Sequence, residues 1–297
     1  MSASLIRDVT EETGKKVEQE QRTEALIAYT HPEEAAPQFL PAERKRGTLY
    51  VLTDGSQVNT RQQGKDGSTW KEMKLGEVYS DDHVIRSQGG RALLTQKEYV
   101  AYFGSVEGLK PLLFDAAARA GYGQYERTVM IGDGAHWICN LCDELFPDAI
   151  QVLDYYHMSE HVYAYARYLY PENEGAMKGW AKATIKDIEC GNVEGVIASL
   201  DGANVPPGVA NLRQYLGHNR HRVNYQELKD QGLHVGSGAI ESGNKKVIQQ
   251  RMKQSGMRWG EVTGQYVAIL RAKSASMMWA YMERMLCISW SLGFIGT

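Results

Sequence analysis

The sequence predicts a mixed α/β protein, in which a sheet with an antiparallel start continues into parallel strands. Three observations predict this class. Short apolar or alternating tracts recur between residues 48 and 153, helical patterns separate the later tracts, and strand patterns stop after Tyr155. An order of three strands, then helix, strand, helix and strand, fits a mixed sheet covered by helices.

Each element has its own local signal. A polar, charged helix is predicted at residues 9–28, and the prolines Pro37 and Pro41 favour a linker at residues 35–46. Alternating or β-branched runs predict strands at 48–58, 71–80, within 91–102, 127–131 and 149–153. Apolar spacing predicts helices at 106–120 and 135–146. Further helices are expected from residue 155, with breaks at Pro171, Pro206-Pro207 and 232–238.

Composition places the chain among soluble globular proteins. It has 297 residues, of which 43% are hydrophobic and 23% charged. Four cysteines are too few for a disulfide scaffold at this length, which favours a reducing, cytoplasmic compartment. The apolar tract at 277–297 is interrupted by Glu283 and Arg284, so a buried or interfacial helix is predicted there rather than a membrane span.

The net charge of −3 conceals an uneven distribution. Residues 211–273 contain eleven Lys or Arg and four acids, whereas residues 1–40 contain four basic and eight acidic residues. A basic segment of this kind favours a polyanionic partner, and a solvated helical face is the alternative interpretation.

Two aspartates follow apolar strand tracts and are followed by glycine. Asp54 stands in Thr53-Asp54-Gly55, where the first strand is predicted to end, and Asp133 precedes Gly134 after the 127–131 tract. Loops at strand ends can carry polar groups on a rigid frame, and glycine allows a ligand to approach closely. Asp-Gly is also a common turn pair. If the two carboxylates share divalent cations, a third is needed to complete the oxygen ligands.

Glu241 is the predicted third carboxylate. It lies in GSGAIESGNKKVIQQRMKQSGMRW (236–259), where a Gly-Ser turn precedes a helix. Lys245 is its neighbour one turn later, so a surface ion pair is the simpler interpretation. The basic segment is centred on the same helix, which favours metal binding beside cations that hold phosphate.

Four stretches together resemble the DDE transposases of bacterial insertion sequences, in the branch related to Mutator-like elements. They are LTDGSQV (52–58), VMIGDGAHWI with FPDAIQVLDYYHMSEH (129–161), NRHR (219–222) and the stretch at 236–259. The resemblance implies an RNase H-like mixed sheet with flanking helices, interrupted by an all-helical insertion. It implies that Asp54, Asp133 and Glu241 are the catalytic, metal-binding triad. The family's Asp/Cys-x-x-His element corresponds to Asp154-Tyr155-Tyr156-His157.

The resemblance also divides the chain. It implies an acidic N-terminal helix and linker at 1–46, a first core part at 47–154, a helical insertion at 155–235, and the glutamate helix with C-terminal helices at 236–297. Family members usually carry an extra N-terminal region that binds the element ends. Residues 1–46 are too short and too acidic for that role, so the chain is expected to lack stand-alone end recognition.

The implied activity is DNA cleavage and strand transfer with two Mg²⁺ or Mn²⁺ ions. The implied partners are transposon ends and target DNA, bound by a homodimer or higher oligomer associated with the nucleoid. Residues expected to contact DNA are His157, Lys245, Lys246, Arg251, Lys253, Arg258 and Trp259. His157 as a capping or core residue, and Trp259 as a core residue, are the alternatives.

Three other interpretations remain open at the sequence level. Asp154, His157 and His161 have a spacing that also suits a zinc hydrolase. A catalytically inactive or domesticated DNA-binding protein derived from a transposase is a further alternative. His136, Cys139 and Cys142 have metal-ligand spacing too, but their place in an apolar helix favours packing.

Overall fold

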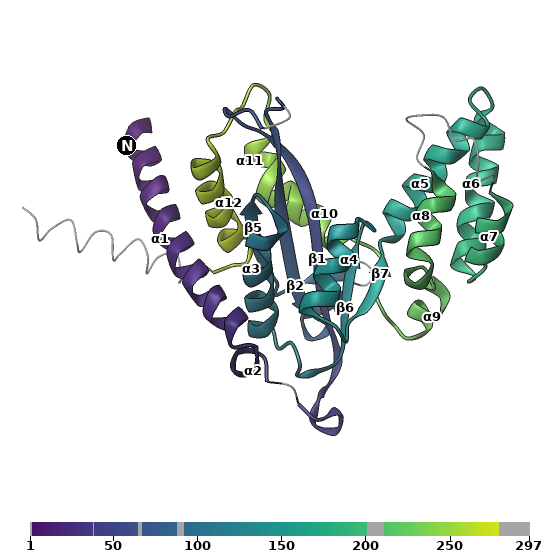
Figure 1. The fold of residues 1–297 in the computed structure, drawn as a ribbon, viewed down its shortest axis with the longest axis horizontal. Helices are drawn as coiled ribbons and strands as arrows, with labels where there is room; N and C mark the ends of the chain where they lie inside the picture. The colour runs from purple at the N-terminus through teal and green to yellow at the C-terminus, as the bar shows by residue number, and fades with distance from the viewer. Residues whose placement is uncertain (1, 38, 65–66, 88–91, 201–210, 279–297) are drawn as a thin grey trace, which may run out of the picture. The chain divides into compact units, whose positions relative to one another are not determined.

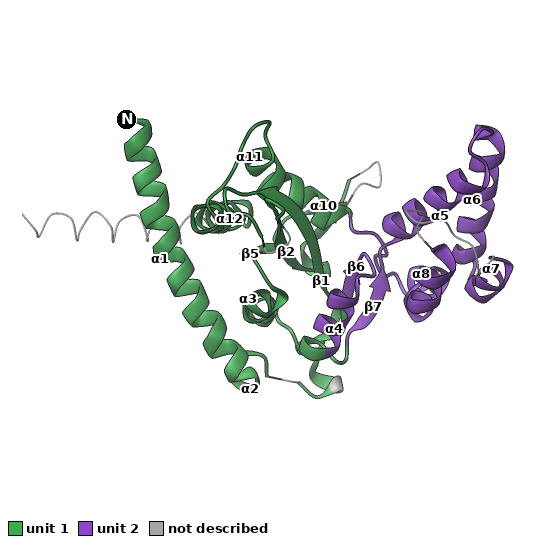
Figure 2. Cartoon of the chain, turned by 45° about the horizontal axis from the view of Figure 1, so that its top comes forward, with its two compact units in different colours: residues 1–129, 144–148, 238–297 green, residues 130–143, 149–237 purple. Residues whose placement is uncertain are grey.

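The computed structural model describes residues 2–37, 39–64, 67–87, 92–200 and 211–278. The chain divides into two compact units (Figure 2). Unit 1 contains residues 1–129, 144–148 and 238–297, and unit 2 contains residues 130–143 and 149–237.

One five-stranded sheet forms the centre of the fold (Figure 1). Its strands are β1 (Lys45–Asn59), β2 (Trp70–Ser80), β5 (Glu98–Phe103), β6 (Tyr125–Gly132) and β7 (Ile150–Leu153). They lie in the order β5-β2-β1-β6-β7, and β2 pairs antiparallel with both β1 and β5. The predicted class is confirmed, because a mixed sheet flanked by helices is consistent with an RNase H-like fold.

The two longest strands are buried through most of their length. Leu49, Tyr50, Val51 and Leu52 of β1 have no exposed surface, and every residue of β2 from Met73 onward is buried. A continuous buried run of this kind belongs to a strand covered on both faces.

Helices of unit 1 cover both faces of β2. A Cβ at Gly76 would lie 2.7 Å from Leu113 of α3 (Val106–Arg119). The neighbouring pair Glu77 and Tyr99 points to the opposite face, where the Tyr99 ring contacts Gly243 of α10 (Gly238–Asn244). Adjacent residues of a strand alternate between faces, so α3 and α10 lie on opposite sides.

The tract at 48–58 forms a strand as predicted, but the expectation that this strand ends at Asp54 is wrong. β1 continues through Asp54 and Gly55 to Asn59, and Asp54 is paired with Leu75 of β2 inside the ladder. Gly55 is paired with Lys74, and a Cβ at Gly55 would meet the Glu72 side chain. The Asp-Gly pair is therefore an interior position with a close neighbour, not a turn.

Among the remaining helices of unit 1, the first two pack against α3 and the last packs against β5 and α1. They are α1 (Ala3–Thr30), α2 (Pro32–Ala35), α11 (Gln250–Met252) and α12 (Glu261–Ala275), with a π-helical turn at Lys245–Gln249 and single 3-10 turns at Pro41–Glu43 and Asp81–His83. Gly14 lets α1 approach α12 directly, since a Cβ there would collide with Tyr266. A short hairpin of β3 (Val84–Arg86) and β4 (Ala92–Leu94) stands apart from the main sheet.

Helices dominate unit 2. They are α4 (His136–Leu145), which begins there, α5 (Tyr155–Leu169), α6 (Glu174–Glu189), α7 (Val193–Ser199), α8 (Leu212–Asn219) and α9 (Tyr225–Asp230), with a 3-10 turn at Arg220–Arg222. Asn173 and Asn211 cap α6 and α8 by accepting backbone N–H groups. α5 ends before Pro171, as predicted, because proline cannot continue the helix.

In the part of the chain that the structure describes, no helix is long and apolar enough to cross a membrane. The predicted break at Pro206-Pro207 and most of the tract at 277–297 lie outside the described residues.

Candidate functional site

Asp54 is held in β1 by two hydrogen bonds. Its Oδ1 accepts the Gly55 backbone N–H at 2.7 Å, and its Oδ2 accepts the side-chain amide of Asn244. The residue is half-buried. Both oxygens of the carboxylate are thus fixed by donors from the protein.

Asn244 joins the helix of Glu241 to this strand. It is 1% exposed and lies one turn after Glu241 on α10. Its Nδ2 donates to Asp54, while its Oδ1 accepts the Ser56 hydroxyl at 3.3 Å. Glu241 itself is exposed near the start of the helix, as the sequence predicts. Within unit 1, the structure therefore brings together the strand of Asp54 and the helix of Glu241.

Asp133 belongs to unit 2 and follows the last residue of β6, where it is predicted. Its Oδ1 accepts the Ala135 N–H at 2.8 Å across a turn that Gly134 makes with φ +86°. A side chain at Gly134 would collide with Leu153 and come within 3.0 Å of Asn219. The turn that carries Asp133 thus requires glycine both for its backbone and for its neighbours.

Tyr215 of α8 braces the Asp133 turn. Its hydroxyl donates to the Asp133 carbonyl at 3.0 Å, and its ring stacks on His161 at 3.8 Å between centroids. Burial lowers the pKa of His161 and, together with the charge of Asp133, raises the pKa of Tyr215. At neutral pH the imidazole is therefore mostly neutral and the phenol fully protonated.

The NRHR stretch supports the same turn. Arg222 donates from Nη1 to the side-chain Oδ1 of Asn219 at 3.1 Å and also contacts Cys139 Sγ. Asn219 in turn donates to the Tyr215 carbonyl at 2.9 Å. Neither Tyr215 nor Asn244 is singled out by the sequence, because a tyrosine or asparagine inside a helix has no distinctive local pattern.

Asp154 has a structural role at the start of α5. It has no exposed surface, its Oδ2 accepts the His157 backbone N–H at 3.0 Å, and its Oδ1 accepts the Ser237 N–H at 2.7 Å. Its carboxylate therefore acts as a buried N-cap. The His157 imidazole is about one-third exposed, with Nε2 4.0 Å from Asp154.

The spacing proposed for zinc does not produce a ligand cluster. All three residues, Asp154, His157 and His161, lie in the described part of unit 2. Their possible ligand atoms do not all come within 4.8 Å of one another. Cys142 is 1% exposed, and burial raises its thiol pKa to about 12. Packing, as expected for this apolar helix, therefore explains Cys142, while Cys139 contacts Arg222.

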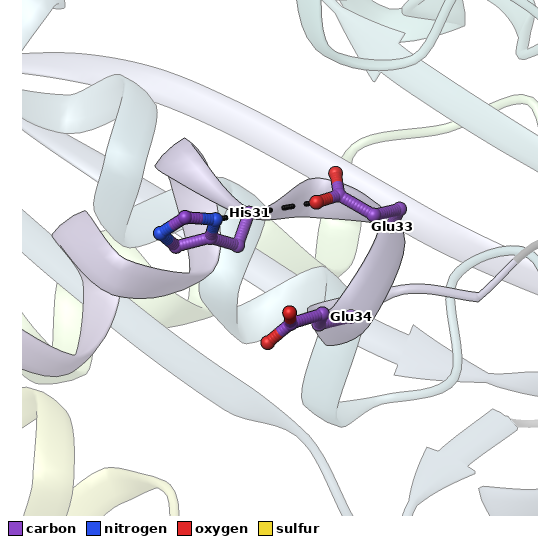
Figure 3. Close-up of side chains that lie close together, drawn as sticks. All are labelled: His31, Glu33 and Glu34. Carbon is purple, nitrogen blue, oxygen red and sulfur yellow. Dashed lines mark ion pairs between the residues drawn. The ribbon is translucent and has the colours of Figure 1, made fainter.

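One surface cluster does meet that distance criterion. His31, Glu33 and Glu34 lie close together at the start of α2, and all three are exposed (Figure 3). The His31 Nδ1 is 4.0 Å from the Glu33 carboxylate. Two glutamates in the first turn stabilise the helix dipole, and this explains the cluster without an ion.

The predicted cations of the basic segment are exposed on or beside α10 and α11. These residues are Lys245, Lys246, Arg251, Lys253 and Arg258. Trp259 is half-buried, its Nε1 donates to the Met252 carbonyl at 3.1 Å, and the Arg251 guanidinium lies 4.8 Å from its ring centroid. One face of the indole is therefore covered by a cation rather than open for base stacking.

No protein-family model and no curated protein matches the chain. Among solved structures, the chain is similar to the Drosophila P element transposase in its strand transfer complex, with a TM-score of 0.27 and 11% identity. The match covers 84% of this chain and 68% of that chain. A TM-score this low supports no shared activity, so function has to follow from the residues themselves.

Proposed function

We propose that the chain is a DDE-type transposase that cleaves DNA and joins DNA strands with two Mg²⁺ or Mn²⁺ ions. The proposed ligands are the carboxylates of Asp54, Asp133 and Glu241. One observation carries the proposal: the buried Asn244 fastens the helix of Glu241 to the Asp54 carboxylate, although the two residues are 190 positions apart in the sequence. A polar bridge of this kind is typical of the groups that orient metal ligands.

The residues fit hard divalent cations by their chemistry. All three are carboxylates, and oxygen ligands are what Mg²⁺ and Mn²⁺ prefer. When bound, two such ions activate the attacking hydroxyl and stabilise the leaving oxygen of an in-line displacement. The protein's part is to fix the ligands, with Asn244 and Gly55 holding Asp54, and Ala135 and Tyr215 holding the Asp133 turn.

DNA is the substrate class that the surroundings favour. The exposed Lys245 and Lys246 follow Glu241 by about one helical turn, so cations lie beside the proposed metal ligand. Cations in that position bind phosphates without reading sequence. Joining two element ends to a target requires paired active sites, so we expect at least a dimer on DNA.

The test is nicking of supercoiled plasmid with Mn²⁺ by the full chain. Asp54→Asn, Asp133→Asn and Glu241→Gln are each expected to lower the rate at least about 100-fold, because each removes a ligand of the ions that stabilise the transition state. Glu172→Gln is the matched control, since Glu172 is exposed in the turn between α5 and α6.

The outcomes separate the candidate functions. Undiminished nicking by Glu241→Gln would contradict the assignment of this glutamate. Tight DNA binding by a wild-type chain that never cleaves would favour a DNA-binding protein derived from a transposase. Activity that requires zinc and is abolished by His157→Ala, but not by Asp54→Asn, would favour the hydrolase.

A further inference from the structure

A groove in unit 1 collects four arginines. It has a volume of about 620 Å³ and is lined by Arg7, Arg61, Arg251 and Arg258, together with Trp259. These residues come from the start of α1, the residues after β1 and the segment that joins α11 to α12. Figure 1 shows these parts at the same end of unit 1.

Backbone hydrogen bonds fix the floor of this groove. The Trp259 N–H donates to the Asn59 carbonyl at 3.0 Å, and the Arg61 N–H donates to the Trp259 carbonyl at 2.9 Å. Thr60 and Trp259 form a parallel bridge between them. The segment after α11 therefore pairs with the chain at the end of β1. This pairing holds Arg61 and Trp259 side by side.

Arg251 is held above the indole. Its guanidinium carbon lies 4.8 Å from the Trp259 ring centroid, and its Nη1 lies 3.3 Å from Met257 Sδ. A guanidinium over a tryptophan face is attracted by the ring and loses side-chain freedom before any ligand arrives. The remaining N–H groups of its planar fork can still reach phosphate oxygens.

Among the arginines of the groove, Arg7 is paired with an acid and, in the part of the chain that the structure describes, the other three are not. Asp8 is paired with Arg7 at 3.3 Å, and Glu11 accepts the Thr263 hydroxyl at 3.2 Å. Within the described ranges, Arg61, Arg251 and Arg258 have no ion pair with an acid. Three arginines without acidic partners at one groove create a positive potential that attracts anions.

We propose that this groove binds the phosphodiester backbone of duplex DNA, with the N-terminal part of α1 as one wall. The choice of DNA rests on the proposed function, while the anion site itself rests on the arginines. Other exposed cations of unit 1, Lys245, Lys246 and Lys253, belong to the same basic segment, and an extended backbone can contact several of them at once. The N-terminal helix α1 is acidic overall, but it contributes to DNA binding because it forms a wall of the groove and places Arg7 there.

The experiment measures binding of a fluorescent 30-bp duplex by anisotropy, in EDTA, over a series of salt concentrations. The double variant Arg61→Gln/Arg258→Gln is expected to bind at least 10-fold more weakly at about 100 mM salt, and its salt slope is expected to fall by about 0.9 for each lost phosphate contact. Arg86→Gln is the control, because Arg86 is an exposed arginine of β3 away from the groove. Thermal melting of each variant checks that it folds.

Glu11→Gln tests the wall formed by α1. Removing this acid from the groove is expected to tighten binding about two-fold, because a like charge near the phosphates is lost. Glu12→Gln on the same helix is the matched control, since Glu12 is exposed outside the groove and pairs with Lys16.

Unchanged affinity and salt slope in the double arginine variant would overturn the groove proposal. The proposal would also be overturned if the wild type bound single-stranded RNA more tightly than duplex DNA and the double variant lost this preference. Asp54→Asn is expected to bind DNA as the wild type does while losing cleavage. Failure of the groove and failure of the active site therefore give different results.

Discussion

Asn244 donates its side-chain amide to Asp54 and accepts the Ser56 hydroxyl, so these two hydrogen bonds tie α10 to β1. A buried amide with both ends used in this way has little freedom to turn. Its role is to position Asp54 and the start of the Glu241 helix, and it is not itself a proposed metal ligand.

Replacement of Asn244 is therefore expected to damage activity indirectly. Asn244→Ala removes the amide that donates to Asp54. We expect a rate or metal affinity about 10–100-fold lower, the usual effect of losing a group that orients a metal ligand. The measurement is plasmid nicking over a range of Mn²⁺ concentrations, which separates metal affinity from maximal rate.

Asn192→Ala is the control for this residue, because Asn192 is an exposed asparagine before α7 whose side chain makes no capping bond. An Asn244→Ala protein with wild-type rate and wild-type metal dependence would show that the bridge to Asp54 does not matter for activity.

The sequence can indicate the candidate carboxylates, but it cannot indicate the residues that hold them in place by hydrogen bonds. Asp133 precedes Gly134 at the end of an apolar strand tract, and Glu241 lies in the first turn of a helix that follows a Gly-Ser turn. Residue type and local pattern are therefore enough to make both of them candidates. Asn244 and Tyr215 matter because of partners that are distant in sequence, and no local pattern reports such a partner.

At the scale of single elements, α10 lies directly on the sheet because Gly243 has no side chain. A Cβ at Gly243 would lie 2.5 Å from the Tyr99 ring of β5. The Tyr99 backbone N–H is itself fixed by the Ser276 hydroxyl at 2.8 Å, so the strand cannot easily yield. The position of α10, and with it Glu241 and Asn244, depends on this close approach.

Gly243→Ala is expected to push α10 away from β5. We expect a loss of about 1–3 kcal/mol in unfolding free energy from overpacking, and a loss of nicking activity larger than that of Asn244→Ala. Denaturant unfolding and the nicking assay measure the two effects separately.

Gly179→Ala is a glycine replacement that is expected to stabilise the protein, in contrast to Gly243→Ala. Gly179 lies inside α6, and a Cβ there meets nothing within 4 Å. This change is expected to stabilise the helix by up to about 1 kcal/mol and leave activity unchanged. Equal stability of Gly243→Ala and the wild type would contradict the close contact with Tyr99.

Helices and strands with long or uniform sequence patterns could be predicted, but the residues at which they end could not always be predicted. The runs of β2 and α3 specify their structure locally, and both form where they are predicted. The end of β1 was mispredicted because Asp54-Gly55 carries a turn signal, whereas pairing with β2 extends the strand. The β3–β4 hairpin has three residues in each strand, too few for periodicity to show.

At the scale of the whole molecule, charge is arranged by region rather than by total. A net charge of −3 argues against a nucleic-acid partner if charge is averaged over the chain. The structure places exposed cations of the basic segment beside the Glu241 helix and lines one groove with four arginines. Local potential, not net charge, decides where a polyanion binds.

Stability of the whole fold should depend on pH through Glu77. Both of its carboxylate oxygens are buried in β2, and Lys97 Nζ lies 3.4 Å from Oε1. Burial outweighs the attraction of Lys97 and raises the pKa of Glu77 to about 7. The native state therefore binds a proton that the unfolded chain releases between about pH 4.5 and 7.

Unfolding free energy is accordingly expected to fall as pH rises through this window, by roughly 3 kcal/mol in all, and to lose nothing further from Glu77 above it. Glu77→Gln removes the titration, so the variant should gain stability relative to the wild type as pH rises from 4.5 to 7. Comparing the two proteins at each pH by urea unfolding cancels the contribution of the histidines, which titrate in the same range. Glu126→Gln, at an exposed position of β6, is the control and should follow the wild type. A constant difference between Glu77→Gln and wild type across the window would mean that Glu77 stays ionised in the native fold, with Lys97 compensating its burial.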